Sequence, residues 1–207
     1  MLDSNKWSIY KISMLIVAVI YIIIRILGVL FVVEMSQMQI LGILLLGMIP
    51  EVALLLTLLF VPNQYRMLAI IPLLYMVTKS SVELVGSVSI GLQLSSSFGY
   101  IFTNIIKRAA DALLFMFMLI FMLPMIQYKK DHVIIPIVIL ITFIFLYLTN
   151  IVANLGYLSV VSPLGFIDHI VIRNLVLYIS IPIIFTLYIL IGIEDQKKKN
   201  LMGSTVS

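Results

Sequence analysis

Long runs of apolar residues dominate this sequence and constrain its fold more than any other feature. A helix needs about 20 such residues to cross the hydrocarbon of a bilayer, and its backbone groups must then be paired within the helix. Six stretches of the chain reach this length, at residues 7–33, 38–61, 67–92, 101–126, 133–154 and 170–193. The sequence therefore predicts an all-α protein, a polytopic transmembrane helix bundle of about six spans.

Short polar segments separate the predicted spans. Residues 34–37 form a minimal polar turn, residues 62–66 begin with a proline, and residues 95–99 are rich in serine. Such compositions are typical of turns and loops. The longest connection is predicted at residues 155–168, which contain two glycines and a proline.

The composition agrees with a chain embedded in lipid. The 207 residues are 63% hydrophobic and 11% charged, with a mean hydropathy of +1.23, whereas a soluble domain is about half apolar and about a quarter charged. We expect a single transmembrane domain over residues 1–196 and a short cytoplasmic tail over residues 197–207. The first apolar stretch is too long for a signal peptide and lacks a typical cleavage site, so we expect it to be retained.

Several function classes are excluded by the rare residue types. The chain has no cysteine, which rules out disulfides, thiolate metal sites and a cysteine nucleophile. One histidine at each face, His132 and His169, is too few for a zinc or haem site. The net charge is +4, but the basic residues lie thinly between apolar spans and form no stripe that would bind nucleic acid. We therefore expect no metal, no cofactor and no nucleic-acid partner.

The distribution of Lys and Arg predicts that both chain ends lie in the cytoplasm, because cytoplasmic loops carry an excess of basic residues. In this orientation the cytoplasmic side holds Lys6, Lys11, Arg66, Lys129, Lys130, Lys197, Lys198 and Lys199. The outer side holds Lys107, Arg108 and Arg173, which the topology rule disfavours and which therefore need a reason. The composition, rich in Ile, Met and Lys, hints at a bacterial inner membrane.

Four polar residues recur at every fourth position of the predicted span at residues 67–92. By this spacing Tyr75, Lys79, Glu83 and Ser87 lie along one face of a helix. A charge at mid-membrane costs about 2.5 to 3.5 kcal/mol on insertion scales, so such residues normally face a partner or a water-filled cavity. Two interpretations stay open: a polar stripe that lines a path for a substrate or ion, or a Lys79–Glu83 ion pair that holds helices together.

Glu51 directly follows Pro50 in the predicted span at residues 38–61. If the proline interrupts this helix, the carbonyl groups that it frees and the carboxylate would together form an oxygen-rich site for a proton or cation. The alternative, which we favour, is that Glu51 forms an ion pair with Arg25 or Lys79.

A third group of polar residues is predicted near the outer ends of the spans. Lys107 and Asp111 are four residues apart, as are Asn104 and Arg108, so two polar ridges lie side by side. The other members of this group are Arg25, Glu34, Asn150, Asn154, Asp168, His169 and Arg173. Its four cations would form an outward-facing pocket for an anionic ligand such as a carboxylate, a phosphate or a lipid headgroup. The alternative is that they extend to the interface and pair with nearby acidic residues.

These patterns favour a membrane transport or ligand-binding component, either a small carrier or the membrane subunit of a larger complex. The main alternative is a non-catalytic partner in assembly, immunity or sensing, whose apolar faces would bind another membrane protein or a second copy of the chain. An intramembrane enzyme has less support. Ser89 and His169 fall at similar depth, but residues 86–91 do not match the G-x-S-G motif of rhomboid proteases.

Overall fold

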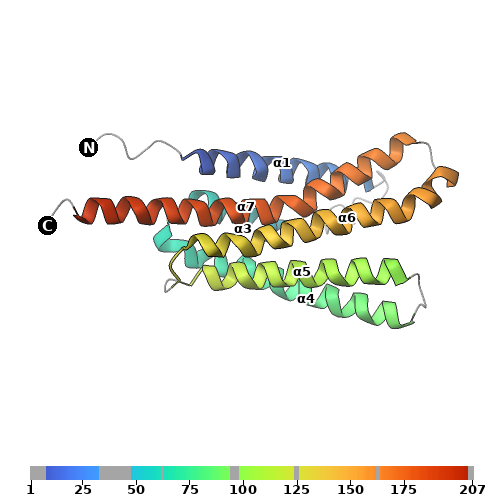
Figure 1. Cartoon of the computed structure of the whole chain (residues 1–207), viewed down its shortest axis with the longest axis horizontal. Coiled ribbons are helices and arrows are strands. Elements are labelled where there is room, and N and C mark those ends of the chain that lie inside the picture. The colour runs from blue at the N-terminus through green and yellow to red at the C-terminus, as the bar shows by residue number, and fades with distance from the viewer. Residues whose placement is uncertain are drawn as a thin grey trace.

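All regular secondary structure in the described part of the chain is helical (Figure 1). The computed structural model describes residues 8–32, 48–61, 63–93, 98–123, 126–161 and 164–204. Its α-helices are α1 (Ile9–Val32), α3 (Ile49–Phe60), α4 (Ile70–Gln93), α5 (Phe98–Phe121), α6 (Ile134–Val161) and α7 (Leu164–Ser204). Two 3₁₀ segments, η1 (Asn63–Ala69) and η2 (Lys130–Val133), precede α4 and α6. The prediction of an all-α chain is confirmed for these residues.

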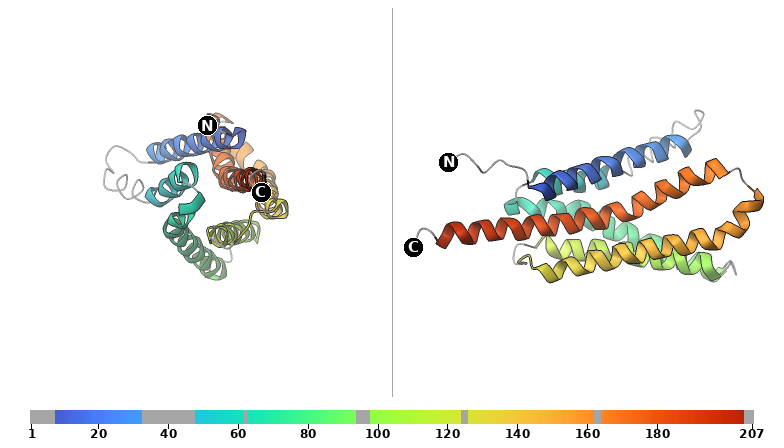
Figure 2. Two further views of the ribbon diagram at one scale, coloured as in Figure 1. Left: turned by 90° about the vertical axis from the view of Figure 1, so that its left-hand side faces the viewer. Right: turned by 45° about the horizontal axis from the view of Figure 1, so that its top comes forward.

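The helices form a closed ring. Each described helix packs against the next one along the chain, and α7 returns to pack against α1. The end view in Figure 2 shows the helices arranged around a common axis. Neighbouring helices run in opposite directions, so the start of α1 and the end of α7 lie at the same end of the bundle, here called the terminal end (Figure 1).

The outer surface of the ring is apolar and its interior is partly polar. Large apolar side chains such as Ile23, Leu113 and Phe145 are exposed in the middle of their helices. Soluble monomers rarely leave large contiguous apolar surfaces open to water. Inside the ring, Met118 and Phe121 of α5 pack with Phe185 of α7 in one buried core.

Three helical stretches of the described residues are long and apolar enough to cross a membrane, and they are Ile9–Leu27, Tyr65–Ser89 and Leu175–Lys198. A shorter apolar helix covers Ile49–Phe60. These stretches agree with three of the six predicted spans, and the full span count stays a prediction.

The described helices differ from the predicted boundaries in three places. The connection expected at residues 155–168 is helical on both sides, because α6 continues to Val161 and α7 begins at Leu164. A glycine inside a long helix costs only about 0.5 to 1 kcal/mol, so the glycines in this stretch do not end the helices. The span expected to reach residue 126 ends earlier, since α5 stops at Phe121. At the other end of the chain, residues 197–204 of the predicted tail continue α7 as helix.

The segment that follows α5 is held against α7 at the terminal end. The buried ring of Tyr128 lies edge-on to the ring of Tyr188, with 3.4 Å between their hydroxyl oxygens. In the orientation that satisfies both groups, the side-chain amide of Gln196 accepts from the backbone N–H of Tyr128 at 3.1 Å and donates to its carbonyl at 3.0 Å. Gly192 permits this close approach, because a Cβ atom there would lie 2.5 Å from a carbon of the Tyr128 ring.

Gly192→Ala is expected to lower the free energy of unfolding by about 1 to 3 kcal/mol, the usual range for overpacking a filled core. The added methyl group overlaps the Tyr128 ring, which is itself packed against Tyr188. Equilibrium unfolding of the purified protein in mixed micelles measures the change.

Gly86 of α4 is the matched control, because a Cβ atom there meets nothing within 4 Å. Gly86→Ala is expected to leave stability unchanged or to raise it by about 0.5 to 1 kcal/mol, since alanine loses less backbone freedom on folding than glycine. Equal losses in the two variants would contradict the packing role of Gly192.

Candidate functional site

A polar cavity of about 370 Å³ lies inside the ring and is lined by residues of all six described helices. We call it the central cavity. Its charged side chains are Arg25, Glu51, Lys79, Glu83, Lys107, Arg108 and Asp111. All seven were candidates from the sequence, where they fell into three separate groups. The ring brings these groups to one place.

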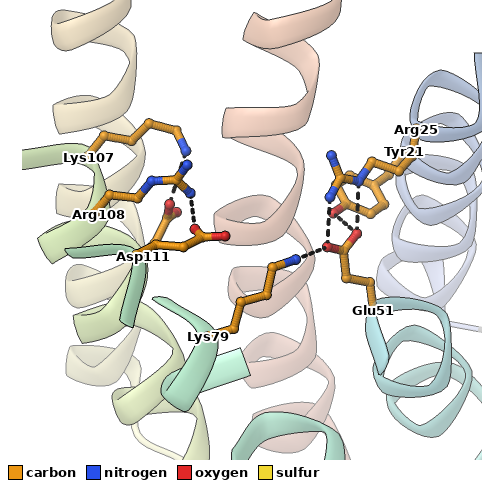
Figure 3. Close-up of polar contacts among 8 residues, drawn as sticks. Tyr21, Arg25, Glu51, Lys79, Lys107, Arg108 and Asp111 are labelled. Atoms are coloured by element: carbon orange, nitrogen blue, oxygen red, sulfur yellow. Dashed lines mark hydrogen bonds and ion pairs between the residues drawn. The ribbon is translucent and has the colours of Figure 1, made fainter. Parts of the chain in front are cut away.

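One cluster of charges centres on Glu51, whose side chain is buried with 4% exposed. Arg25 donates to both carboxylate oxygens, from Nε at 3.1 Å and from Nη2 at 3.0 Å. The hydroxyl of Tyr21 donates at 2.8 Å, and Nζ of Lys79 donates at 3.4 Å. Figure 3 shows Tyr21 and Arg25 on one side of the carboxylate and Lys79 on the other. Helices α1, α3 and α4 are thus tied together at one buried group.

Helix α3 begins at Ile49, which places Pro50 in its first turn. The N–H that a proline lacks has no partner in the first turn of a helix, so Pro50 removes no hydrogen bond within α3. The prediction that the proline interrupts a longer span also involves residues 38–47, which lie outside the described part of the chain. The alternative prediction, pairing with Arg25 or Lys79, is confirmed for both cations.

A second cluster lies across the cavity on α4 and α5 (Figure 3). Nζ of Lys107 is 3.1 Å from a carboxylate oxygen of Asp111 and lies 4.4 Å from the ring centroid of Tyr178. Arg108 forms an ion pair with Glu83. The predicted Lys79–Glu83 pair is therefore wrong: Lys79 pairs with α3 and Glu83 with α5, because the neighbouring helices present opposite charges across the interior.

Of the four residues in the predicted stripe along α4, only the middle two, Lys79 and Glu83, line the cavity. A step of four residues turns a helix by about 40° beyond a full circle, so Tyr75 and Ser87 end up about 120° apart. Tyr75 is 46% exposed and does not line the cavity, and the hydroxyl of Ser87 donates to the carbonyl of Glu83 at 2.8 Å. The α4 residues that line the cavity are Met76, Lys79, Ser80 and Glu83. Their i, i+3, i+4, i+7 spacing is the signal that identifies one helix face.

Sequence reasoning missed two polar residues of the cavity, Tyr21 and Tyr178, and considered Ser80 only for the enzyme interpretation, beside Lys79. Tyr21 stands four residues before Arg25, a spacing that places both on one face of α1. Ser80 is buried on the face of α4 that also carries Lys79. Tyr178 carried no local signal, because its role depends on α7 packing beside α5 and α6.

The cavity gives a reason for the two basic residues of α5 that were predicted to lie on the outer side. Lys107 lies nine residues after Phe98, the first residue of α5, which is roughly 14 Å along a helix. Both Lys107 and Arg108 line the cavity inside the ring. They are therefore residues of a helix that face the interior of the ring and not residues of a surface loop.

Five predicted site residues lie outside the residues whose side chains are described: Asn104, Asn150, Asn154, His169 and Arg173. Ser89, the serine of the enzyme interpretation, is exposed and does not line the cavity. Within the described residues, no group of three or more His, Cys, Asp or Glu could hold a metal ion.

No protein family, characterised protein or solved structure matches this chain. Its function is therefore inferred from the cavity itself. Among the residues whose side chains are described, four cations and three carboxylates line the cavity, so these groups carry one positive charge in excess when all are ionised.

Proposed function

We propose that this chain is an integral membrane protein that binds a small anionic solute in the central cavity, as a carrier or as the ligand-binding membrane subunit of a larger complex. The observation that carries the proposal is a cavity with seven charged side chains inside a ring whose outer surface is apolar. Charged residues at membrane depth normally mark a path for a substrate or ion, or a bound partner.

Helix lengths support six spans. Helices α5 and α6 contain 24 and 28 residues, which gives about 36 and 42 Å at 1.5 Å per residue, more than the roughly 30 Å of hydrocarbon in a bilayer. The charged residues of α5 line the cavity, so lipid need not solvate them. As described, α3 has 12 residues, and residues 38–47 of its predicted span lie outside the described part of the chain.

The location of the basic residues supports a cytoplasmic terminal end. Six described basic residues lie near helix ends or connections there: Lys11, Arg66, Lys129, Lys130, Lys197 and Lys198. The other four with described side chains line the central cavity. Because basic residues collect on the cytoplasmic side, we place both chain ends in the cytoplasm, consistent with a bacterial inner membrane.

Lys79 is the residue at which the excess positive charge is concentrated. Glu51 is held by Arg25 through two contacts of 3.0 and 3.1 Å, whereas Lys79 reaches the same carboxylate at 3.4 Å. One carboxylate thus serves two cations, and the longer contact belongs to Lys79. A carboxylate or phosphate group of a ligand would supply the missing negative charge through charge-assisted hydrogen bonds.

The size and lining of the cavity suit a small solute. About 370 Å³ lies near the lower end of the range typical of small-molecule sites, roughly 300 to 1,000 Å³. Ser80 offers a hydroxyl beside Lys79, and the rings of Phe115 and Phe143 form an apolar part of the lining. We propose that the anionic group of the ligand contacts Lys79 and Ser80 and that its apolar part faces the phenylalanine rings.

Ligand-induced stabilisation tests the proposal. The purified protein in detergent is heated with inorganic phosphate, phosphate monoesters and short carboxylates, and at least one of these anions is expected to raise the unfolding temperature. A ligand at 100 times its Kd contributes about 2.7 kcal/mol. Uptake of the same anion into proteoliposomes would distinguish a carrier from a binding subunit.

Lys79→Met supplies the decisive variant. It leaves Glu51 paired with Arg25 and makes the cavity lining neutral, so the protein should stay folded while stabilisation by the anion is lost. Lys198→Met, which removes a charge exposed at the terminal end, should keep the stabilisation. The proposal fails if no anion stabilises the wild-type protein or if Lys79→Met responds as the wild-type protein does.

The ion pairs themselves favour a second candidate function, a non-catalytic membrane partner. Two of the three carboxylates in the cavity, Glu51 and Glu83, pair with cations of other helices, as expected if these charges only lock helices together, whereas Asp111 pairs within α5. Replacing Glu83 and Arg108 together with Met and Leu would then keep stability, because an ion pair inside a protein can often be exchanged for apolar residues without loss. Another membrane protein should also remain bound after mild detergent extraction.

A further inference from the structure

A second cavity, of about 410 Å³, lies at the terminal end where α1 and α7 pack against each other. We call it the terminal cavity. The start of α1 contributes Ile9 and Tyr10, α7 contributes Ile193 and Lys197, and the first residue of η2, Lys130, lies at its edge. It shares no lining residue with the central cavity.

Two lysines make the terminal cavity cationic. Lys130 and Lys197 are both exposed, and neither forms an ion pair with another residue in the described part of the chain. Glu194 is the acidic residue of the lining, and its carboxylate is already occupied by the hydroxyl of Ser8 and by Lys198 at 3.0 Å. Two ammonium groups thus face the cavity without a counter-ion from the described residues.

Apolar side chains lie directly beside these charges. Ile9, Leu190 and Ile193 form the apolar part of the lining. Tyr10 stands at the end of a stretch long and apolar enough to cross a membrane, a position where tyrosine is common at membrane–water interfaces. A pair of cations beside an apolar wall matches a ligand whose phosphate is joined to hydrocarbon.

We propose that the terminal cavity binds the headgroup of an anionic phospholipid of the cytoplasmic leaflet. Lys130 and Lys197 contact the phosphate, and the upper part of an acyl chain lies along Ile9 and Ile193. The cytoplasmic leaflet is the one that carries anionic lipids, and basic residues near it are attracted to its negative surface. Because the lining comes from α1, η2 and α7, the bound lipid joins the first and last helices at the seam that closes the ring.

Nanodiscs of phosphatidylglycerol and of phosphatidylcholine with identical acyl chains test this proposal. The wild-type protein is expected to unfold at a higher temperature in phosphatidylglycerol, and native mass spectrometry is expected to detect phosphatidylglycerol retained after partial delipidation. Lys130→Gln combined with Lys197→Gln should abolish the preference and reduce the retained lipid at least tenfold. Both lysines are exposed, so the double variant should fold normally.

Lys11→Gln combined with Lys129→Gln is the matched control, because it removes the same charge from the same end of the bundle without touching the cavity lining. An equal loss in this control would overturn the proposal in favour of diffuse surface attraction. A further experiment adds glycerol phosphate to the protein in detergent. If it stabilises the protein as much as the lipid does, the site belongs to a free phosphate compound and the lipid proposal is overturned. No preference in the wild-type protein would also overturn it.

Discussion

Glu51→Leu is expected to lower the free energy of unfolding by about 3 to 5 kcal/mol, the loss typical of removing one partner from a buried ion pair. The carboxylate is 4% exposed and accepts hydrogen bonds from Tyr21, Arg25 and Lys79. Without it, two positive charges are left inside the ring with no nearby counter-charge in this cluster. Equilibrium unfolding in mixed micelles measures the loss.

Glu194→Leu is the matched control, since this carboxylate forms an i, i+4 ion pair with Lys198, whose side chain is 55% exposed. Exposed pairs contribute only about 0 to 1 kcal/mol, so a small change is expected. Adding Arg25→Met and Lys79→Met to Glu51→Leu should restore most of the stability, because no unpaired charge then remains in the cluster. Equal behaviour of Glu51→Leu and Glu194→Leu would show that the cluster does not hold α1, α3 and α4 together.

Arg66→Ala is expected to cost about 3 kcal/mol, because it removes two hydrogen bonds that a charged donor makes to carbonyl groups. Arg66 of η1 is 9% exposed, and its guanidinium donates to the carbonyls of Leu123 and Ile126, the latter at 3.1 Å. It also lies 5.2 Å from the ring centroid of Tyr128. The carbonyl of Leu123 also accepts from the backbone N–H of Ile126 at 3.2 Å, so the carbonyl of Ile126 is the one whose donor among the described residues is lost on substitution.

Two further substitutions serve as reference variants in the same unfolding measurement. Arg66→Lys should recover part of the loss, because an ammonium keeps the charge but not the planar guanidinium that brings Nη2 to both carbonyls and lies over the Tyr128 ring. Lys198→Ala should change stability by less than about 0.5 kcal/mol, as is usual for an exposed position. If Arg66→Ala resembles Lys198→Ala, the connection between α5 and α6 does not depend on Arg66.

The fold class followed from local properties of the sequence. Apolar runs of span length predict helices because only paired backbone groups are stable in lipid, and α1 and α4 closely match their predicted ranges. The same reasoning identified Glu51 and Lys79 as residues that need partners, since a charge inside an apolar run is costly wherever the helix lies. Helix ends were less predictable, because a glycine does not end a long helix whose other hydrogen bonds remain.

The pairing of the charges was decided by tertiary structure. Lys79 and Glu83 are near neighbours on one helix, yet each pairs with a different adjacent helix. Which pairs form depends on the order of the helices around the ring and on the rotation of each about its axis, and neither is encoded within a single apolar run. The packing of α7 against α1 was likewise decided by tertiary structure. The sequence by itself determined that these charges need a partner or a water-filled cavity, whereas the ring determined their partners and gathered them around one cavity.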